Sequence, residues 1–100
     1  MNLDQRIAIV TGAGSGIGAA TAEALAAAGA SVVVTDISEK AAEQTANVIA
    51  QRGQSATALV QDVTSPEQWE QVFEAANATF GAPNALVNNA GVSGAGQDRL

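Results

Sequence analysis

The chain has 100 residues, enough for one small domain, and 47% of them are hydrophobic. Its net charge of −6 argues against nucleic acids and anionic membranes as partners, because both repel an acidic surface. There is no Cys and no His, so disulfides and thiolate sites are excluded and we expect no metal site. Neither an export leader nor a long apolar run is found, and we therefore expect a cytoplasmic protein.

The glycine-rich stretch from Thr11 to Gly18 organises the sequence. It follows an apolar run that predicts a buried strand over residues 6–11, and it leads into an alanine-rich segment that predicts a helix. Glycines let the backbone approach a ligand closely, and the free N–H groups at a helix N-terminus attract an anion. A pyrophosphate fits such a turn best, whereas a P-loop is excluded because no Lys follows the last glycine. A turn that binds nothing remains the alternative.

The first helix is expected to end at Gly29, since glycine suits the position just past a helix C-terminus. A β-branched run over residues 31–35 predicts the second strand, which stops at Asp36. The apolar residues of the helix predict one buried stripe, formed by Ile17, Ala20, Ala24, Leu25 and Ala28.

Ser38 is placed to cap a second helix that extends to about Arg52, and Gly53 ends it. A third strand is expected over residues 56–63, and it ends in Asp62-Val63. The expected inner face of the second helix consists of Ala42, Thr45, Ala46 and Ile49.

Ser65 and Pro66 mark the start of a third helix, with Gln68 placed to bond back to the cap residue. Gly81 ends this helix, and residues 85–88 predict a fourth strand. The residues that recur at helical spacing, all three aromatics among them, favour core packing over a ligand site: Trp69, Val72, Phe73, Ala76 and Phe80.

Strands that alternate with helices through short loops predict right-handed crossovers and a parallel sheet. The sequence contains no linker, repeat or low-complexity segment. It is therefore predicted to form an α/β domain with the architecture of half a Rossmann-type fold.

Asp36 ends the second predicted strand at roughly 20 residues from the glycines, where a carboxylate meets the ribose of a dinucleotide. Such a carboxylate accepts hydrogen bonds from the ribose hydroxyls and repels a 2′-phosphate. NADP would require a cation nearby, yet Ser15 and Ile37 are uncharged, so NAD is favoured. The alternative is that Asp36 only caps the turn into Ser38.

Four motifs, in this order and spacing, resemble those of the short-chain dehydrogenase/reductase family: Thr11-Gly12-x-x-x-Gly16-x-Gly18, Asp36, Asp62-Val63 and Asn88-Asn89-Ala90-Gly91. The resemblance covers essentially the whole chain. It implies a four-stranded parallel sheet in the order 3-2-1-4 with three helices, which is a truncated doubly wound Rossmann fold. Residues 1–100 would be the N-terminal, dinucleotide-binding part of one such domain.

The resemblance also implies a role for each motif. Asp36 would hold the adenosine ribose, and Asn88 would be a structural residue that bonds across the sheet. Asp62 and Val63 would border the adenine. The residues that would contact the pyrophosphate are Gly12, Ser15, Gly16, Ile17 and Gly18. Those that would line the nicotinamide ribose are Asn89, Ala90 and Gly91.

Members of this family transfer a hydride with a Tyr and a Lys spaced Tyr-x-x-x-Lys, supported by a Ser and an Asn. This sequence has no Tyr, and its only Lys is Lys40, so we expect no catalytic residue within it. The resemblance therefore implies an inactive fragment of an NAD-dependent enzyme that interconverts secondary alcohols and ketones. The complete enzyme would be a homo-oligomer.

Two other functions stay open. One is a stand-alone nucleotide-binding module without catalysis. The other is half of an S-adenosylmethionine methyltransferase, which also uses a glycine loop and an acidic residue after the second strand. The motif at residues 88–91 counts against the methyltransferase.

Overall fold

The computed structural model describes residues 2–89 and alternates strands with helices. The strands are β1 (Ile7–Thr11), β2 (Ser31–Asp36), β3 (Ala56–Val60) and β4 (Ala85–Asn88). The helices are α1 (Gly16–Ala27), α2 (Glu39–Gln51) and α3 (Pro66–Thr79). All strand pairs are parallel and the sheet order is β3-β2-β1-β4, so the predicted α/β fold and strand order are confirmed.

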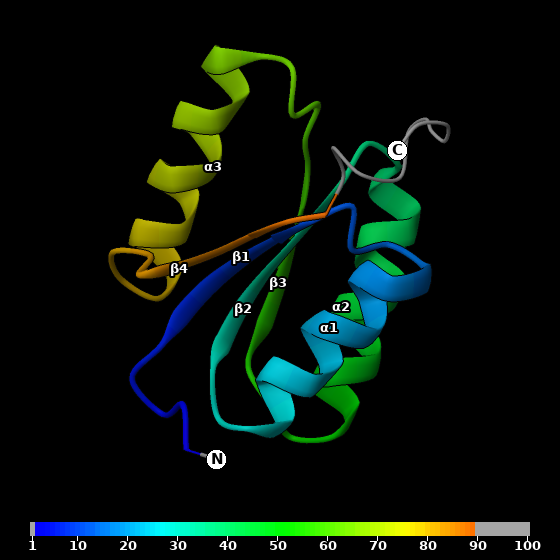
Figure 1. Cartoon of the computed structure of the whole chain (residues 1–100), viewed down its shortest axis with the longest axis vertical. Coiled ribbons are helices and arrows are strands. Elements are labelled where there is room, and N and C mark those ends of the chain that lie inside the picture. Colours follow the sequence, from blue (N-terminus) through cyan, green and yellow to red (C-terminus); the bar gives the residue numbers. More distant parts are fainter. Residues whose placement is uncertain (1, 90–100) are drawn as a thin grey trace.

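The sheet lies between two layers of helices, with α1 and α2 on one face and α3 on the other (Figure 1). Because side chains alternate along a strand, each strand contributes to both halves of the core. Val10 and Val34 pack in the cluster under α1 and α2, whereas Ile9 and Val33 pack against α3. Within residues 2–89, no helix is long and apolar enough to cross a membrane.

The buried face of α1 differs from the predicted one. Ile17 is 78% exposed, and Ala20 and Ala24 are also exposed, so the predicted stripe was wrong at these positions. In an alanine-rich helix nearly every side chain is apolar, and the pattern therefore singles out no face. Close packing on the sheet selects the smallest residues instead, and those buried are Gly18, Ala22 and Ala26.

The predicted face of α2 is confirmed. Ser38 caps this helix through its Oγ, which accepts a hydrogen bond from the Ala41 N–H at 3.2 Å. Gly53, with a φ of 76°, lies beyond its end as expected. The buried residues are the four predicted ones: Ala42, Thr45, Ala46 and Ile49.

Strand β3 ends at Val60, three residues before the predicted end. The Gln61 N–H still donates to the Asp36 carbonyl at 2.9 Å. The next residue, Asp62, accepts bonds from both the N–H and the Oγ1 of Thr64. This local turn competes with the strand for the backbone, as Asp and Thr side chains commonly do.

Helix α3 begins as predicted, with Ser65 Oγ accepting a bond from the Gln68 N–H at 3.3 Å. The predicted return bond from Gln68 to the cap residue is wrong, because Gln68 Oε1 accepts from the Asp62 N–H at 2.7 Å. Gln68 therefore secures the turn after β3 as well as the helix start.

The three aromatic residues in α3 and at its C-cap are only partly buried in the core. Phe80 packs against the cluster that contains Ile9, but Phe73 is 42% exposed. Trp69 is half-buried, and its ring centroid lies 6.0 Å from that of Phe73. Val72 and Ala76, which are buried, make the main contact with the sheet.

The small face of α1 generates the first prediction. Ala22→Leu is expected to destabilise the chain by about 1–3 kcal/mol, because a larger side chain must displace well-packed neighbours. Ala24→Leu, on the exposed face of the same helix, is expected to change stability by less than about 0.5 kcal/mol. Chemical denaturation of both variants measures the difference, and equal losses would contradict the observed face.

Candidate functional site

The carboxyl ends of the four parallel strands lie at one edge of the sheet, and the predicted site residues follow these ends. Strand β1 pairs with β2 on one side and with β4 on the other. The strand order therefore changes direction at β1, and in open α/β sheets ligands bind in the crevice beside such a point. We take this edge as the candidate site.

The glycine-rich loop after β1 needs glycine for two different reasons. Gly12 and Gly16 have φ values of 60° and 61°, in the left-handed region that favours glycine. Gly18 is buried, and a Cβ there would overlap the carbonyl oxygen of Gly12. Asn89 donates through Nδ2 to the same carbonyl at 3.3 Å. The structure thus brings three predicted site residues, Gly12, Gly18 and Asn89, into one group.

The N-terminus of α1 differs from those of α2 and α3. Its N-cap residue, Ser15, makes no side-chain capping bond within residues 2–89, whereas Ser38 and Ser65 cap the other two helices. Its first turn also lacks the acidic residue that the others have in Glu39 and Glu67. The first N–H groups of a helix have no intrahelical partner, and the helix dipole adds partial positive charge. This end of α1 therefore favours an anion.

The start of α1 is exposed among residues 2–89. No atom of these residues would lie within 4 Å of a Cβ built on Gly16, and the neighbouring Ser15 and Ile17 are exposed. The loop and the first turn of α1 therefore fit a pyrophosphate, held by backbone N–H groups rather than by basic side chains.

Asp36 is half-buried at the end of β2 and uses both carboxylate oxygens. Oδ2 accepts a bond from the Gly14 N–H at 2.9 Å, and Oδ1 accepts one from the Ser38 N–H at 3.0 Å. The second bond is the turn cap that the alternative interpretation expected. The first joins Asp36 to the glycine-rich loop through Gly14, which was not among the predicted site residues. The pattern G-x-G-x-x-A formed by Gly14, Gly16 and Ala19 was the signal for it.

Asp62 and Val63 reach the same edge as a separate group. Thr64 donates to Asp62 Oδ1 through Oγ1 at 2.6 Å and through its N–H at 2.9 Å, and these bonds lower the pKa of Asp62. Because the pKa of Asp62 is lowered in the folded state, the two bonds stabilise the fold while the carboxylate is ionised. This stabilisation is lost as the pH falls through the folded-state pKa of Asp62. Trp69 Nε1 donates to the Val63 carbonyl at 2.8 Å. Within residues 2–89, neither residue has a hydrogen bond to the glycine-rich loop.

Asn88, at the end of β4, is bonded to the neighbouring strand β1 at this edge. Thr11 Oγ1 donates to Asn88 Oδ1 at 3.0 Å, so the bond across the sheet that the resemblance implied is confirmed. Ala90 and Gly91, expected to line the nicotinamide ribose, lie outside the described residues 2–89.

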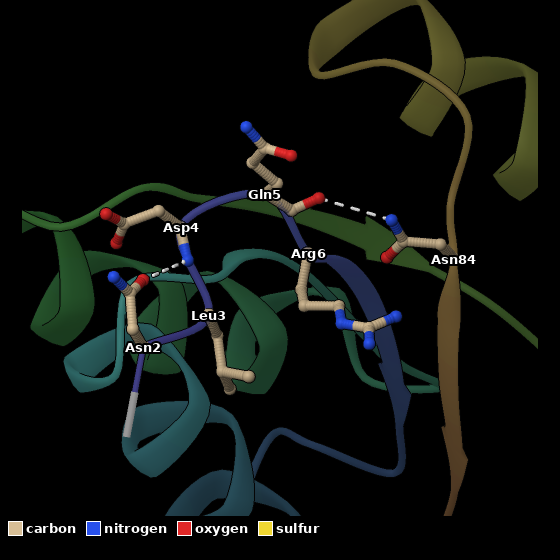
Figure 2. Close-up of a pocket in the computed structure, with 6 residues that line it drawn as sticks. All are labelled: Asn2, Leu3, Asp4, Gln5, Arg6 and Asn84. Carbon is tan, nitrogen blue, oxygen red and sulfur yellow. Dashed lines mark hydrogen bonds between the residues drawn. The ribbon is translucent and has the colours of Figure 1, made fainter.

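A hollow of about 530 Å³ lies at the opposite, amino end of the sheet (Figure 2). Asn84 closes one side of it by accepting a bond from the Ile7 N–H at 2.8 Å and donating to the Gln5 carbonyl at 3.2 Å. No predicted site residue lines it. The hollow is lined by Asn2, Leu3, Asp4, Gln5, Arg6 and Asn84.

Across residues 2–89 no group of three or more Cys, His, Asp or Glu is placed to hold a metal ion.

Comparison with known proteins identifies the family. Residues 6–99 match the family described as short chain dehydrogenase. The chain belongs to this family. It is 44% identical over 93 residues to the 3-oxoacyl-(acyl-carrier-protein) reductase FabG of Escherichia coli (strain K12), covering 93% of this chain and 37% of FabG. It is 48% identical over 88 residues to the probable oxidoreductase EphD of Mycobacterium tuberculosis (strain ATCC 25618 / H37Rv), covering 88% of this chain and 15% of EphD.

A solved short-chain dehydrogenase has the same fold. The structure of 7α-hydroxysteroid dehydrogenase complexed with NADH and 7-oxo glycochenodeoxycholic acid matches with a TM-score of 0.84 and 42% sequence identity. The match covers 87% of this chain and 34% of that one. The sequence thus spans little more than a third of the length of this relative and of FabG.

The uncapped start of α1 leads to the second prediction. Ser38→Ala is expected to lower stability by about 1 kcal/mol, because α2 loses its capping bond. Ser15→Ala is expected to cost less than about 0.5 kcal/mol, since the Ser15 side chain makes no such bond. Urea unfolding of both variants distinguishes the two sites. A loss at Ser15 as large as that at Ser38 would mean that the α1 N-terminus is not free.

Proposed function

We propose that residues 1–100 are the N-terminal, dinucleotide-binding part of a short-chain dehydrogenase that uses NAD to interconvert a secondary alcohol and a ketone. The single observation that carries the proposal is the uncapped, glycine-lined N-terminus of α1 at the carboxyl end of β1. Family membership supports it, as does the NADH in the solved 7α-hydroxysteroid dehydrogenase. The complete enzyme would be a cytoplasmic homo-oligomer.

The pyrophosphate would be held by the backbone of the loop and the first turn of α1. The chain has few basic residues. The positively polarised end of α1 would therefore supply the positive charge that a pyrophosphate needs. When bound, the cofactor supplies or accepts the hydride exchanged with the substrate carbon. The residues proposed to contact the pyrophosphate are Gly12, Ser15, Gly16, Ile17 and Gly18.

The rest of the dinucleotide would extend along the carboxyl edge to either side of the loop. Towards β2 and β3, Asp36 would accept hydrogen bonds from the adenosine ribose, and Asp62 and Val63 would border the adenine. Towards β4, the nicotinamide ribose would lie beside Asn89, a residue that already contacts Gly12. Ala90 and Gly91 complete the proposed nicotinamide side.

The third prediction concerns the choice between NAD and NADP. The chain is expected to bind NAD more tightly, because the Asp36 carboxylate repels a 2′-phosphate and also accepts bonds from a free ribose. Asp36→Asn removes the charge at nearly constant shape and is expected to reduce the difference in affinity between NAD and NADP. Calorimetric titration of both cofactors into both proteins measures this difference. Tighter binding of NADP by the unsubstituted chain would contradict the role proposed for Asp36.

The fourth prediction is that the 100-residue polypeptide alone shows no dehydrogenase or reductase turnover. A phenol held by a lysine is the acid and base that this family uses, and the sequence has no Tyr and only Lys40, which is exposed on α2. The absorbance of NADH with a panel of secondary alcohols and ketones tests this expectation. Turnover that co-purifies with the chain and changes in Asp36→Asn would count against it, whereas turnover unchanged in that variant indicates a contaminant.

A further inference from the structure

Asp36 is the side chain that joins the glycine-rich loop to the start of α2. Its two hydrogen bonds run to segments on either side of it, one to Gly14, 22 residues earlier, and one to Ser38, two residues later. The approach is close: a Cβ on Gly14 would lie 2.9 Å from Asp36 Oδ2 and 2.5 Å from Ala41 Cβ. Glycine at position 14 is therefore required for this contact.

The other two contacts that hold the loop come before Gly14, at Gly12 and Ala13. The Ala13 N–H donates to the Thr35 carbonyl at 2.9 Å, which fixes the first half of the loop to β2. Asn89 holds the carbonyl of Gly12. Among residues 2–89, the segment between Ala13 and the start of α1 is bonded to β2 through the Gly14 N–H and Asp36. It comes just before the N–H groups that would bind the pyrophosphate.

An ionised carboxylate can serve the loop and a ligand at the same time. It offers about four lone-pair positions, of which the two observed bonds use two. Two positions remain for ribose hydroxyls, so binding a dinucleotide does not require Gly14 to be released. A neutral amide has one accepting oxygen, and its nitrogen can only donate, so it cannot hold both N–H groups in the same geometry.

We propose that Asp36 is a positioning residue for the pyrophosphate loop, holding the loop through the Gly14 N–H before any ligand binds. This inference rests on the proposed function, but it assigns Asp36 an effect on a part of the cofactor that it does not touch. The direction of the change in anion affinity distinguishes this positioning role from a purely electrostatic one. Removing a negative charge near an anion site should tighten anion binding through electrostatics alone, whereas loss of the positioned loop should weaken it.

The first experiment needs no ligand. Amide hydrogen exchange at Gly14, followed by NMR on the full chain, is expected to be at least about fivefold faster in Asp36→Asn and in Asp36→Ala. That factor corresponds to the net contribution of one ordinary hydrogen bond. Glu39→Gln is the matched control: Glu39 is exposed and lies three residues away, and its side chain makes no hydrogen bond or ion pair among the described residues. Unchanged Gly14 exchange in both Asp36 variants would overturn the proposal.

The second experiment titrates inorganic pyrophosphate, which has no ribose to meet Asp36. Asp36→Asn is expected to weaken its binding roughly fivefold, while Glu39→Gln leaves it unchanged or slightly tighter. Equal or tighter binding by Asp36→Asn would overturn the positioning role and restrict Asp36 to the ribose. If the unsubstituted chain binds neither pyrophosphate nor NAD, the proposed function fails, and the Gly14 exchange rates still decide whether Asp36 holds the loop.

Discussion

The close approach of α1 to the carboxyl end of β1 is the constraint on which the rest of this structure depends. At Gly18 the helix lies so near the Gly12 carbonyl that no side chain fits between them. A helix seated this close can bury only small residues, which is why Ala22 and Ala26 follow Gly18 at four-residue intervals on the inner face. The same seating places the first turn of α1 beside the carboxyl end of β1. The packing of α1 and the anion site proposed at its N-terminus thus have one geometric cause.

The three helix starts differ in how their first N–H groups are stabilised. Helices α2 and α3 satisfy their first N–H groups with a serine and place a glutamate in the first turn, which stabilises a helix N-terminus. Helix α1 does neither, although Ser15 stands at the capping position. A cap would occupy the N–H groups that a pyrophosphate needs, and a carboxylate would repel it. The missing stabilisation therefore agrees with the pyrophosphate site proposed at this helix end.

The sequence predicted those features that depend on residues close together in the chain. Polar side chains such as Glu43 and Gln44 mark the outer face of α2, so its inner face was predicted residue by residue. In α1 almost every residue is small and apolar, so only the distance to the sheet could select the buried face. The bond from Gly14 to Asp36 and the bond from Asp62 to Gln68 were missed for the same physical reason, because each requires the relative placement of two elements. The loop glycines and Asp36 could be singled out in the sequence because their spacing follows from a strand, a turn and a helix.

On the face of the sheet that packs against α3, the side chains change from apolar to polar near the carboxyl ends of the strands. Leu59, Val33 and Ile9 pack towards α3, and the residues two positions further along are Gln61, Thr35 and Thr11, all of them buried. Thr11 reaches Asn88, but Thr35 Oγ1 and both polar side-chain atoms of Gln61 have no hydrogen-bond partner within residues 2–89. A buried polar group without a partner costs about 1–3 kcal/mol, so apolar residues would make this layer more stable. Local rules of core packing are broken mainly at functional or strained sites. The polar layer therefore supports the site proposed at the carboxyl edge, and this support does not depend on the glycine motif.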